Sequence, residues 1–475
     1  MERNVDKLLQ DLLSAKNRLK QESDFLIFSY VEKVSSLSAM HFFQNCRSKY
    51  KGSRFFWQSA DRKLKFAGAD GYCIHAQGGC NRFQEVETGW QNLTQHSEIH
   101  GLLNMPGTGP ICFGGFSFYD QLKEGSSWSS FSTHLFYLPK FLVTENEEGS
   151  FITATMRLEQ LTTEQELRAF VQELVQLLMS HGELHANLPP LDQLKELASD
   201  EWLTSVTEAV QYMQNTPEEL QKIVLARSLQ LTFHEAVFVE AALLNLIKLQ
   251  PNSTVFCLER GEDAFIGATP ECLIKKYGDQ VDTDCLAGTI DRGKTTEEDA
   301  QLASILLNDD KNQKEHQFVV DHIRAIISES CVEVNIPAEP KILVNRHLQH
   351  LHTPVSANLS KDISIFELVS ALHPTPALGG TPVQKAMEMI PVFENIERGL
   401  FAAPIGWVDA NGDGEFVVGI RSALISEQQA TLFAGCGVVA QSIPSEELLE
   451  TIIKFKPMLT AFAIEEMREK DCQLS

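Results

Sequence analysis

Paired cysteine motifs are missing from this chain of 475 residues, although it contains ten cysteines. No two of them have the C-x-x-C spacing, which argues against a zinc ribbon and against a thioredoxin-like redox motif. Thiols scattered along a long chain are typical of reduced cysteines in a cytosolic protein. We therefore expect free thiols and a cytoplasmic location. The cysteines are Cys46, Cys73, Cys80, Cys112, Cys257, Cys272, Cys285, Cys331, Cys436 and Cys472.

Long apolar runs are also missing. The longest stretch without a charged side chain is Ile99–Tyr119, which contains five glycines and two prolines and is therefore a poor transmembrane helix. The first 20 residues mix acids, bases and leucines, and they lack the continuous apolar core of a signal peptide. We expect no association with a membrane.

Positive charge is scarce, because 40 Lys and Arg residues oppose 64 Asp and Glu residues and leave a formal net charge of −24. This balance argues against a basic groove, so nucleic acid is not the expected partner. No run of Lys and Arg stands out that would attract an anionic membrane. The hydrophobic fraction of 43% supplies enough apolar material for a core and excludes disorder for most of the chain.

The nucleotide-binding signatures G-x-x-x-x-G-K-[ST] and G-x-G-x-x-G do not occur either. Glycine-containing turns are present at Ala287–Thr289, Leu378–Thr381, Gly399 and Gly435–Gly437. Glycine lets backbone N–H groups approach an anion, but most such turns are only structural. None of these turns identifies a site alone.

What the chain does contain is a mixture of strands and helices without a regular βαβ alternation. Residues 25–160 show short β-rich runs broken by Gly and Ser, which is typical of antiparallel sheet. Further along, strand candidates such as 222–231 and 416–425 are interleaved with helix candidates such as 311–329 and 445–467. The pattern predicts a large layered α+β domain.

Lys222 begins the strand candidate 222–231, whose two faces are both mostly apolar. One interpretation is a lysine at the end of a strand that extends its ammonium group to the surface. The other is a partly desolvated lysine with a lowered pKa, able to act as a base.

Glu315 lies on the apolar face of the helix candidate 311–329. A carboxylate is costly to bury there unless it is paired or binds a metal. A salt-bridged glutamate near a helix end is the structural alternative.

Glu447, Glu450 and Lys454 fall near one face of the helix that follows Ser445. A common i,i+4 salt bridge from Glu450 to Lys454 explains this spacing. A second interpretation is a set of oxygen ligands for Mg²⁺, joined by Glu315 from another helix.

Glu271 ends a Gly-Ala-Thr-Pro-Glu turn between two short strand candidates, 264–266 and 273–277. It is either an exposed loop acid or an acid held beside the sheet. Taken alone, these residues predict an α+β enzyme that acts on an anion and uses Mg²⁺.

A set of segments in a fixed order resembles the chorismate-utilising enzymes, which include anthranilate, aminodeoxychorismate, salicylate and isochorismate synthases. The resemblance covers the C-terminal part of the chain, and so many ordered segments make a chance match very improbable. The segments are QKIVLAR (221–227), GATPE (267–271), LAGT (286–289), KEHQFVVDHI (314–323), HL (350–351), LHPTPALGG (372–380), ENIERGLFAAPIGW (394–407), GIRSAL (419–424), GCGVV (435–439) and SIPSEELLETIIK (442–454).

Within this family the chain is most similar to the isochorismate synthases. Aminodeoxychorismate synthases have a lysine where this chain has Ala287, and anthranilate synthases usually lack a lysine at the position of Lys222. The segment 372–380 resembles the isochorismate synthase form, and RFFW (54–57) with GGFSF (114–118) resembles the first part of the enzymes of the menaquinone pathway.

The resemblance implies two packed antiparallel β-sheets with helices outside. It implies that residues 1–200 complete the sheets and that residues 201–475 form the catalytic region, and that the two together make one structural domain.

The resemblance also implies a division of roles. Lys222 would activate water, and Glu271 would protonate the departing hydroxyl of chorismate. Glu315 and Glu450 would hold Mg²⁺, with Glu447 beside it. The remaining expected substrate-binding residues are Arg421, Lys454, Gly435, Gly437, His350, Ala377 and Leu378, and His373 is a further expected pocket residue.

The expected partner is therefore the small molecule chorismate, with no obligatory glutaminase subunit. Two rival hypotheses remain at this point. One is a salicylate synthase or a siderophore-pathway isochorismate synthase. The other is a catalytically dead relative with a regulatory role, although the catalytic positions are intact.

Overall fold

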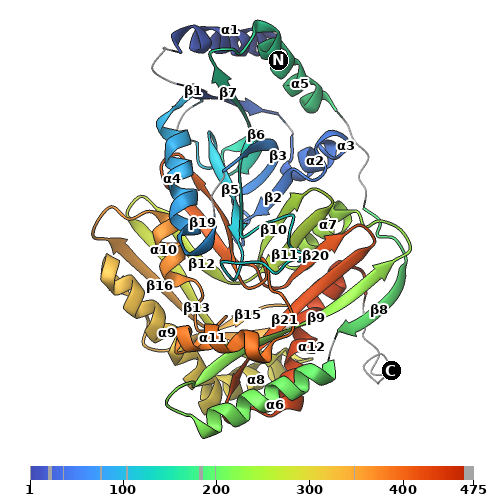
Figure 1. The fold of residues 1–475 in the computed structure, drawn as a ribbon, viewed down its shortest axis with the longest axis vertical. Coiled ribbons are helices and arrows are strands. Elements are labelled where there is room, and N and C mark those ends of the chain that lie inside the picture. The colour runs from blue at the N-terminus through green and yellow to red at the C-terminus, as the bar shows by residue number, and fades with distance from the viewer. Residues whose placement is uncertain are drawn as a thin grey trace.

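The structure, a computed structural model, describes residues 2–19, 24–35, 37–74, 78–102, 105–180, 186–197, 199–346 and 348–464 (Figure 1). Cys472 and residues 465–467 of the helix expected over 445–467 lie outside these ranges, and the helix itself ends earlier than expected, at Ala461. The nine described cysteines are free, as the sequence predicts.

Helices and strands follow one another irregularly along the chain. The helices are α1 (Glu2–Arg18), α2 (Ala39–Asn45), α3 (Arg47–Tyr50), α4 (Arg82–Gln95), α5 (Glu164–Met179), α6 (Ser199–Asn215), α7 (Val239–Leu249), α8 (Thr296–Asn308), α9 (Asp310–Ser330), α10 (Ile365–Leu372), α11 (Val383–Phe393) and α12 (Pro444–Ala461), with a 3-10 turn at Gly79–Asn81. The strands are β1 (Phe25–Val34), β2 (Arg54–Gln58), β3 (Lys65–Cys73), β4 (Ser97–Gly101), β5 (Ile111–Phe116), β6 (His134–Asn146), β7 (Gly149–Glu159), β8 (Leu191–Leu197), β9 (Lys222–Phe233), β10 (Thr254–Arg260), β11 (Asp263–Thr269), β12 (Cys272–Tyr277), β13 (Gln280–Asp291), β14 (Cys331–Asn335), β15 (Lys341–Val344), β16 (Leu348–Leu359), β17 (Gly380–Thr381), β18 (Pro404–Asp409), β19 (Gly414–Val418), β20 (Ser422–Ser426) and β21 (Gln429–Val439).

Antiparallel pairing joins most strands into one continuous ladder. Its order is β8, β9, β21, β20, β11, β10, β2, β3, β6, β5, β18, β19, β12, β13 and β16. We call the strands from β8 to β3 the first arm and those from β5 to β16 the second arm. β6 joins the two arms and also pairs with β7, which continues to β1.

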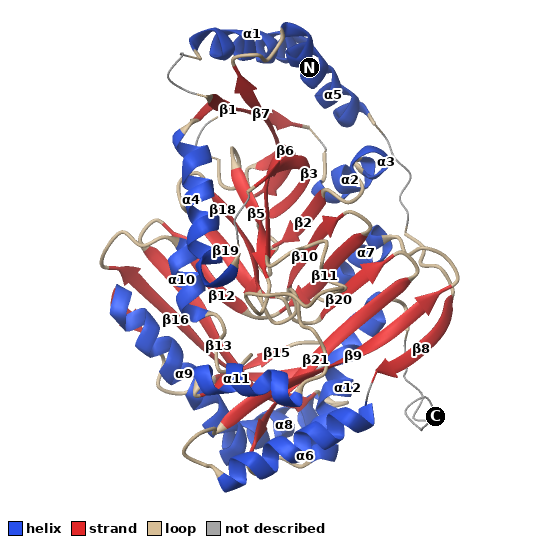
Figure 2. Ribbon diagram, viewed as in Figure 1, coloured by secondary structure: helices blue, strands red, loops and turns tan. Residues whose placement is uncertain are grey.

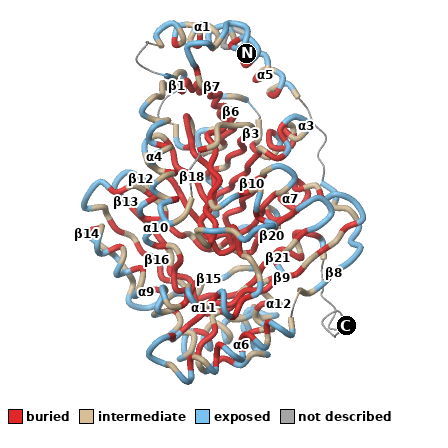
Figure 3. The backbone as a smooth tube through the Cα atoms, viewed as in Figure 1, coloured by how far each residue is buried: buried red, intermediate tan, exposed pale blue. Residues whose placement is uncertain are grey.

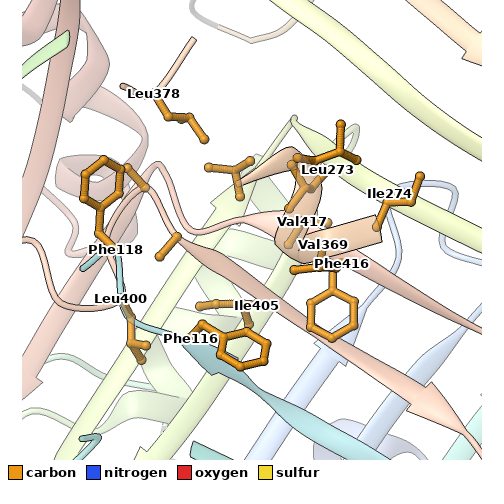
Figure 4. Close-up of a cluster of buried hydrophobic side chains, with 14 of the residues drawn as sticks. Phe116, Phe118, Leu273, Ile274, Val369, Leu378, Leu400, Ile405, Phe416 and Val417 are labelled. Atoms are coloured by element: carbon orange, nitrogen blue, oxygen red, sulfur yellow. The ribbon is translucent and has the colours of Figure 1, made fainter. Parts of the chain in front are cut away.

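The two arms enclose a shared apolar core. Ile223 of β9 and Phe256 of β10 belong to the same buried cluster as Ile405 of β18 and Phe416 of β19. Figure 4 shows part of this cluster, and Figure 3 shows that the buried backbone is concentrated in the strands at the centre of the molecule. The expected α+β architecture of two packed antiparallel sheets is confirmed.

β10, in the middle of the first arm, is buried on both faces. Phe256 and Leu258 point into the core between the arms, whereas Val255 and Cys257 belong to a second cluster. Successive side chains of a strand alternate between faces, so an apolar run serves both clusters. The second cluster also contains residues of α7 and α12, which pack against each other and lie outside the strands in Figure 2.

The N-terminal strands are built into the same ladder as the C-terminal ones. β2 pairs with β10, and β5 pairs with β18. Residues of the first 200 positions therefore share hydrogen-bonded sheets with residues that follow position 200.

The strand expected over 416–425 is divided in the structure. β19 ends at Val418 and β20 begins at Ser422. Between them Arg421 has a φ of +51°, a left-handed conformation that an extended strand does not contain. The apolar pattern predicted the two ends of this segment but not its interruption.

Candidate active site

A pocket of about 90 Å³ lies among segments that are far apart in the sequence. Its walls come from β9, β13, β16 and β21, from α9 and α12, from the turns after β11 and before β20, and from the loops on either side of α11. Among the predicted site residues, those that line it are Glu271, Glu315, His350, Ala377, Leu378, Arg421, Gly435, Gly437, Glu450 and Lys454.

Lys222 and Glu315 form an ion pair beside this pocket. Lys222 Nζ lies 2.8 Å from Glu315 Oε1, and the two side chains are 1% and 15% exposed. Among the described residues Lys222 Nζ has no other polar partner. Burial by itself would raise the pKa of Glu315, but the neighbouring Lys222 and Lys454 hold it below its usual value.

Gly437 makes room for that pair. A Cβ atom at this position would lie 2.5 Å from Glu315 Oε1 and 2.7 Å from Lys222 Cε. Any larger residue would displace one member of the pair. The glycine at 437 is therefore required by close packing.

Lys454 connects the C-terminal helix to the glycine-rich end of β21. Its Nζ lies 2.5 Å from Glu450 Oε1 and donates a hydrogen bond to the Gly435 carbonyl at 2.9 Å. The i,i+4 salt bridge exists, and both of its members also line the pocket. The salt bridge is therefore compatible with the second interpretation, in which this helix supplies oxygen ligands to the pocket.

Glu447 is set apart from the other glutamates. It is buried, and its Oε1 lies 2.9 Å from Lys311 Nζ. Its side chain is not part of the pocket wall. Its Oε2 atom is buried without a hydrogen-bond partner in the described part of the chain.

Glu271 and Arg421 face the pocket from the turn after β11 and the turn before β20. Burial raises the pKa of Glu271 to about 7, against the opposing effect of Arg421. Burial lowers the pKa of Arg421 to about 10, which leaves its guanidinium charged at neutral pH. The pocket therefore holds an acid close to its titration point and a permanent cation.

The two candidate histidines differ in position. His350 lines the pocket, its Nδ1 lies 3.0 Å from Thr289 Oγ1, and burial lowers its pKa to about 3. His373 does not line the pocket, contrary to its expected place there. Its Nε2 lies 3.2 Å from the Phe118 carbonyl, so it holds a loop in position.

The carboxylates offer the oxygen donors that Mg²⁺ prefers, but they are not gathered around one point. In the part of the chain that the structure describes, no three His, Cys, Asp or Glu side chains are close enough to hold an ion. Glu315 and Glu450 face the same pocket, and each pairs with a lysine. Glu447 precedes Glu450 by three residues in the sequence, and its Oε2 atom has no hydrogen-bond partner among the described residues. The donor set fits a Mg²⁺ site that draws on Glu315 and Glu450.

Sequence reasoning missed Arg398, whose side chain lines the pocket and is fully buried. It lies in the segment ENIERGLFAAPIGW, which contributed to the resemblance but suggested no role for this residue. The available signal was a charged residue shortly before the apolar run 400–403. None of the helices in the described ranges has the length and apolarity needed to cross a membrane.

Comparison with known proteins extends the similarity over almost the whole chain. Residues 11–463 match the family described as "Chorismate binding enzyme". The chain is 37% identical to isochorismate synthase MenF of Bacillus subtilis (strain 168) over 461 residues, which cover 95% of this chain and 97% of that protein. It is 32% identical to the salicylate biosynthesis isochorismate synthase of Pseudomonas aeruginosa over 399 residues, 83% of this chain and 82% of that protein.

Solved structures show the same fold. The Escherichia coli menaquinone-specific isochorismate synthase MenF matches with a TM-score of 0.78 at 22% identity, over 96% of this chain and 99% of that one. Anthranilate synthase component I of Streptococcus pneumoniae matches with a TM-score of 0.64 at 20% identity, over 94% of this chain and 96% of that one. This chain belongs to the chorismate binding enzyme family.

Proposed function

We propose that this protein is an isochorismate synthase that supplies menaquinone biosynthesis. It converts chorismate to isochorismate by adding water at C2 while the C4 hydroxyl leaves and the ring double bonds shift. The observation that carries the proposal is the pocket that combines Lys222 beside it with Glu271 and Arg421 in its wall. The 37% identity to a menaquinone-type enzyme along 95% of the chain supports the same reaction.

Lys222 and Glu271 suit the two proton transfers. Lys222 accepts a proton from the attacking water, and Glu271 gives one to the departing hydroxyl. A pKa of about 7 keeps Glu271 partly protonated at neutral pH, which an acid catalyst needs. Lys222 pairs with Glu315 at 2.8 Å, and its ammonium group must lose a proton before the neutral amine can act as a base.

Two groups of cations suit the two carboxylates of chorismate. Arg421 binds the enolpyruvyl carboxylate, while Lys454 and the backbone at Gly435–Gly437 meet the ring carboxylate. Glu315 and Glu450, which both line the pocket, are the residues that would hold Mg²⁺. A Mg²⁺ ion bound there would supply positive charge for the ring carboxylate.

The enzyme acts in the cytoplasm without a glutaminase subunit. Its nucleophile is water, so no source of ammonia is required. The free thiols of the described cysteines agree with a reducing compartment.

A product assay tests this function. Purified protein given chorismate and Mg²⁺, without ammonia or glutamine, should form isochorismate, and excess chelator should abolish turnover. Salicylate or anthranilate as the main product would refute the assignment. Full turnover in excess chelator would refute the role of the metal alone.

A further inference from the structure

Arg398 in the pocket wall forms a buried ion pair with Glu394, and the roles above do not use this pair. The side chains of Arg398 and Glu394 are 0% and 2% exposed. Arg398 Nε donates to Glu394 Oε1 and Nη2 donates to Oε2, both at 2.7 Å, so the guanidinium holds the carboxylate through two parallel bonds. Removing both charges from water is costly, and further hydrogen bonds are needed to offset that cost.

Those other contacts join two walls of the pocket. Arg398 Nη2 donates to the Val224 carbonyl at 2.8 Å, and Nη1 donates to the Leu378 carbonyl at 2.9 Å. The Ala226 N–H donates to Glu394 Oε2 at 2.7 Å. Val224 and Ala226 belong to β9, the strand that begins with Lys222, and Leu378 lies in the loop before α11.

The same segment is anchored in the N-terminal half of the chain. The Arg398 guanidinium stacks 4.2 Å from the centre of the Phe118 ring, and the Phe118 N–H donates to the Gly399 carbonyl at 2.6 Å. Phe118 and Leu378 lie at the same side of the apolar cluster in Figure 4. A Cβ atom on Gly399 would lie 2.0 Å from the Trp128 ring, so Gly399 packs directly against this ring and leaves no space for a larger residue.

We propose that Glu394 and Arg398 are positioning residues that set the spacing between β9 and the Ala377–Leu378 wall, and thereby the position of Lys222 against bound substrate. This inference rests on the proposed function, in which Lys222 is the base. Among the described residues, the expected carboxylate anchors Arg421 and Lys454 share no hydrogen bond with this pair. Loosening the pair should therefore affect turnover more than substrate binding.

Arg398→Lys tests the proposal. Lysine keeps the charge but cannot form the planar fork that reaches Glu394, Val224 and Leu378 together. We expect kcat for isochorismate formation to fall ~10–100-fold, since small misplacements of reacting groups have effects of that size. KM and the Kd for chorismate should change by a few-fold at most.

Arg54→Lys is the matched control. Arg54 is 1% exposed and pairs with Glu240 and Glu259 at 2.8 and 2.6 Å, but it does not line the pocket. This variant should lower the thermal midpoint and leave kcat per folded molecule unchanged. An equal loss of kcat in both variants would mean that the pair at 398 acts only through stability, which would overturn the proposal.

Glu394→Asp keeps the test decisive if Arg398→Lys does not fold. It retains both charges but withdraws the carboxylate from the Ala226 N–H, so kcat should again fall while KM stays nearly constant. Guanidinium at non-denaturing concentration should restore part of kcat to Arg398→Ala, because the vacated space adjoins the pocket. Wild-type kcat in both Arg398→Lys and Glu394→Asp would overturn the proposal, whereas absence of isochorismate formation by the wild type would instead reject the proposed function.

Discussion

Lys222 occupies a position where an unpaired charge would be costly. Its side chain is 1% exposed, and Glu315 from another element supplies the compensating charge. The apolar pattern around Lys222 predicted burial on both faces of the strand. It left open whether the ammonium group reaches the surface, and the structure shows that it does not.

Replacement of Lys222 by alanine should lower kcat by about 10²–10⁴, the range typical of a lost proton-transfer group. Steady-state kinetics with chorismate and Mg²⁺ would measure this, with circular dichroism to show that the fold is retained. Ile223→Val, a conservative change at the next residue of β9, should keep near-normal turnover. Near-normal turnover in Lys222→Ala would remove Lys222 as the base.

The raised pKa of Glu271 predicts a pH dependence of activity and a pH dependence of stability. Its pKa is raised to about 7 in the folded protein from an ordinary value of 4.5. As the pH rises through about 7, Glu271 loses its proton, so kcat/KM should fall on that limb and Glu271→Gln should lose most of its activity.

The same shift predicts a stability effect of defined sign. A carboxyl whose pKa is raised by folding favours the folded state below its unfolded pKa, and this contribution is lost as the pH rises towards 7. Glu271→Gln should therefore be more stable than the wild type at pH 8, by on the order of 3 kcal/mol, with the difference vanishing near pH 4. Denaturant titrations at both pH values would show it, and a constant difference would contradict it.

At the scale of single elements, β21 illustrates how a strand forms a site. Its register with β9 places Gly437 opposite Val224 and Val439 opposite Lys222, while Lys454 of α12 bonds to Gly435. The sequence identified these glycines as possible turns that meet an anion. The structure places them in a strand, where Gly437 leaves space for the side chains of the Lys222–Glu315 pair.

Gly437→Ala should reduce kcat strongly, because its Cβ atom would come within 2.5 Å of Glu315 Oε1. Gly435→Ala is a milder change in the same strand, because the atom nearest to the new Cβ would be the Leu225 carbonyl oxygen at 3.1 Å. We expect a smaller loss there. Kinetic assays on the two variants would contradict this packing argument if Gly435→Ala proved the more damaging.

At the scale of the whole molecule, the continuous ladder determines what can fold alone. β2 and β3 of the N-terminal part end the first arm, β5 begins the second, and β6 joins the two arms. The core between the arms contains Trp57 and Phe113 together with Trp407. Removing the N-terminal strands would expose this core and divide the sheet.

A fragment of residues 201–475 should accordingly fail to form a cooperative, active fold. A chain without α1 should fold and keep its kcat with a lower thermal midpoint, because α1 buries Leu8 and Leu12 in the outer cluster, away from the pocket. Thermal unfolding and the product assay would compare the two truncations. An active fragment 201–475 would show two independent domains.

The net charge of −24 offers no guide to the site. The pocket of this acidic protein brings Arg398, Arg421 and Lys454 together with three glutamates, so its local charge is set by pairing. The composition does not reveal how charges pair inside the pocket. It only argues against extended basic surfaces.

The sequence by itself determined the α+β class, the absence of membrane-spanning segments among the described helices, and the residues that the family motifs identify. Alternating apolar residues specify strands and their buried faces locally, so these features can be read one segment at a time. Only the tertiary structure decided that Lys222 pairs with Glu315, that Glu447 stays outside the pocket wall, and that Arg398 joins its two sides. Such contacts depend on which distant strands pair and in what register, and local periodicity contains no information about that choice.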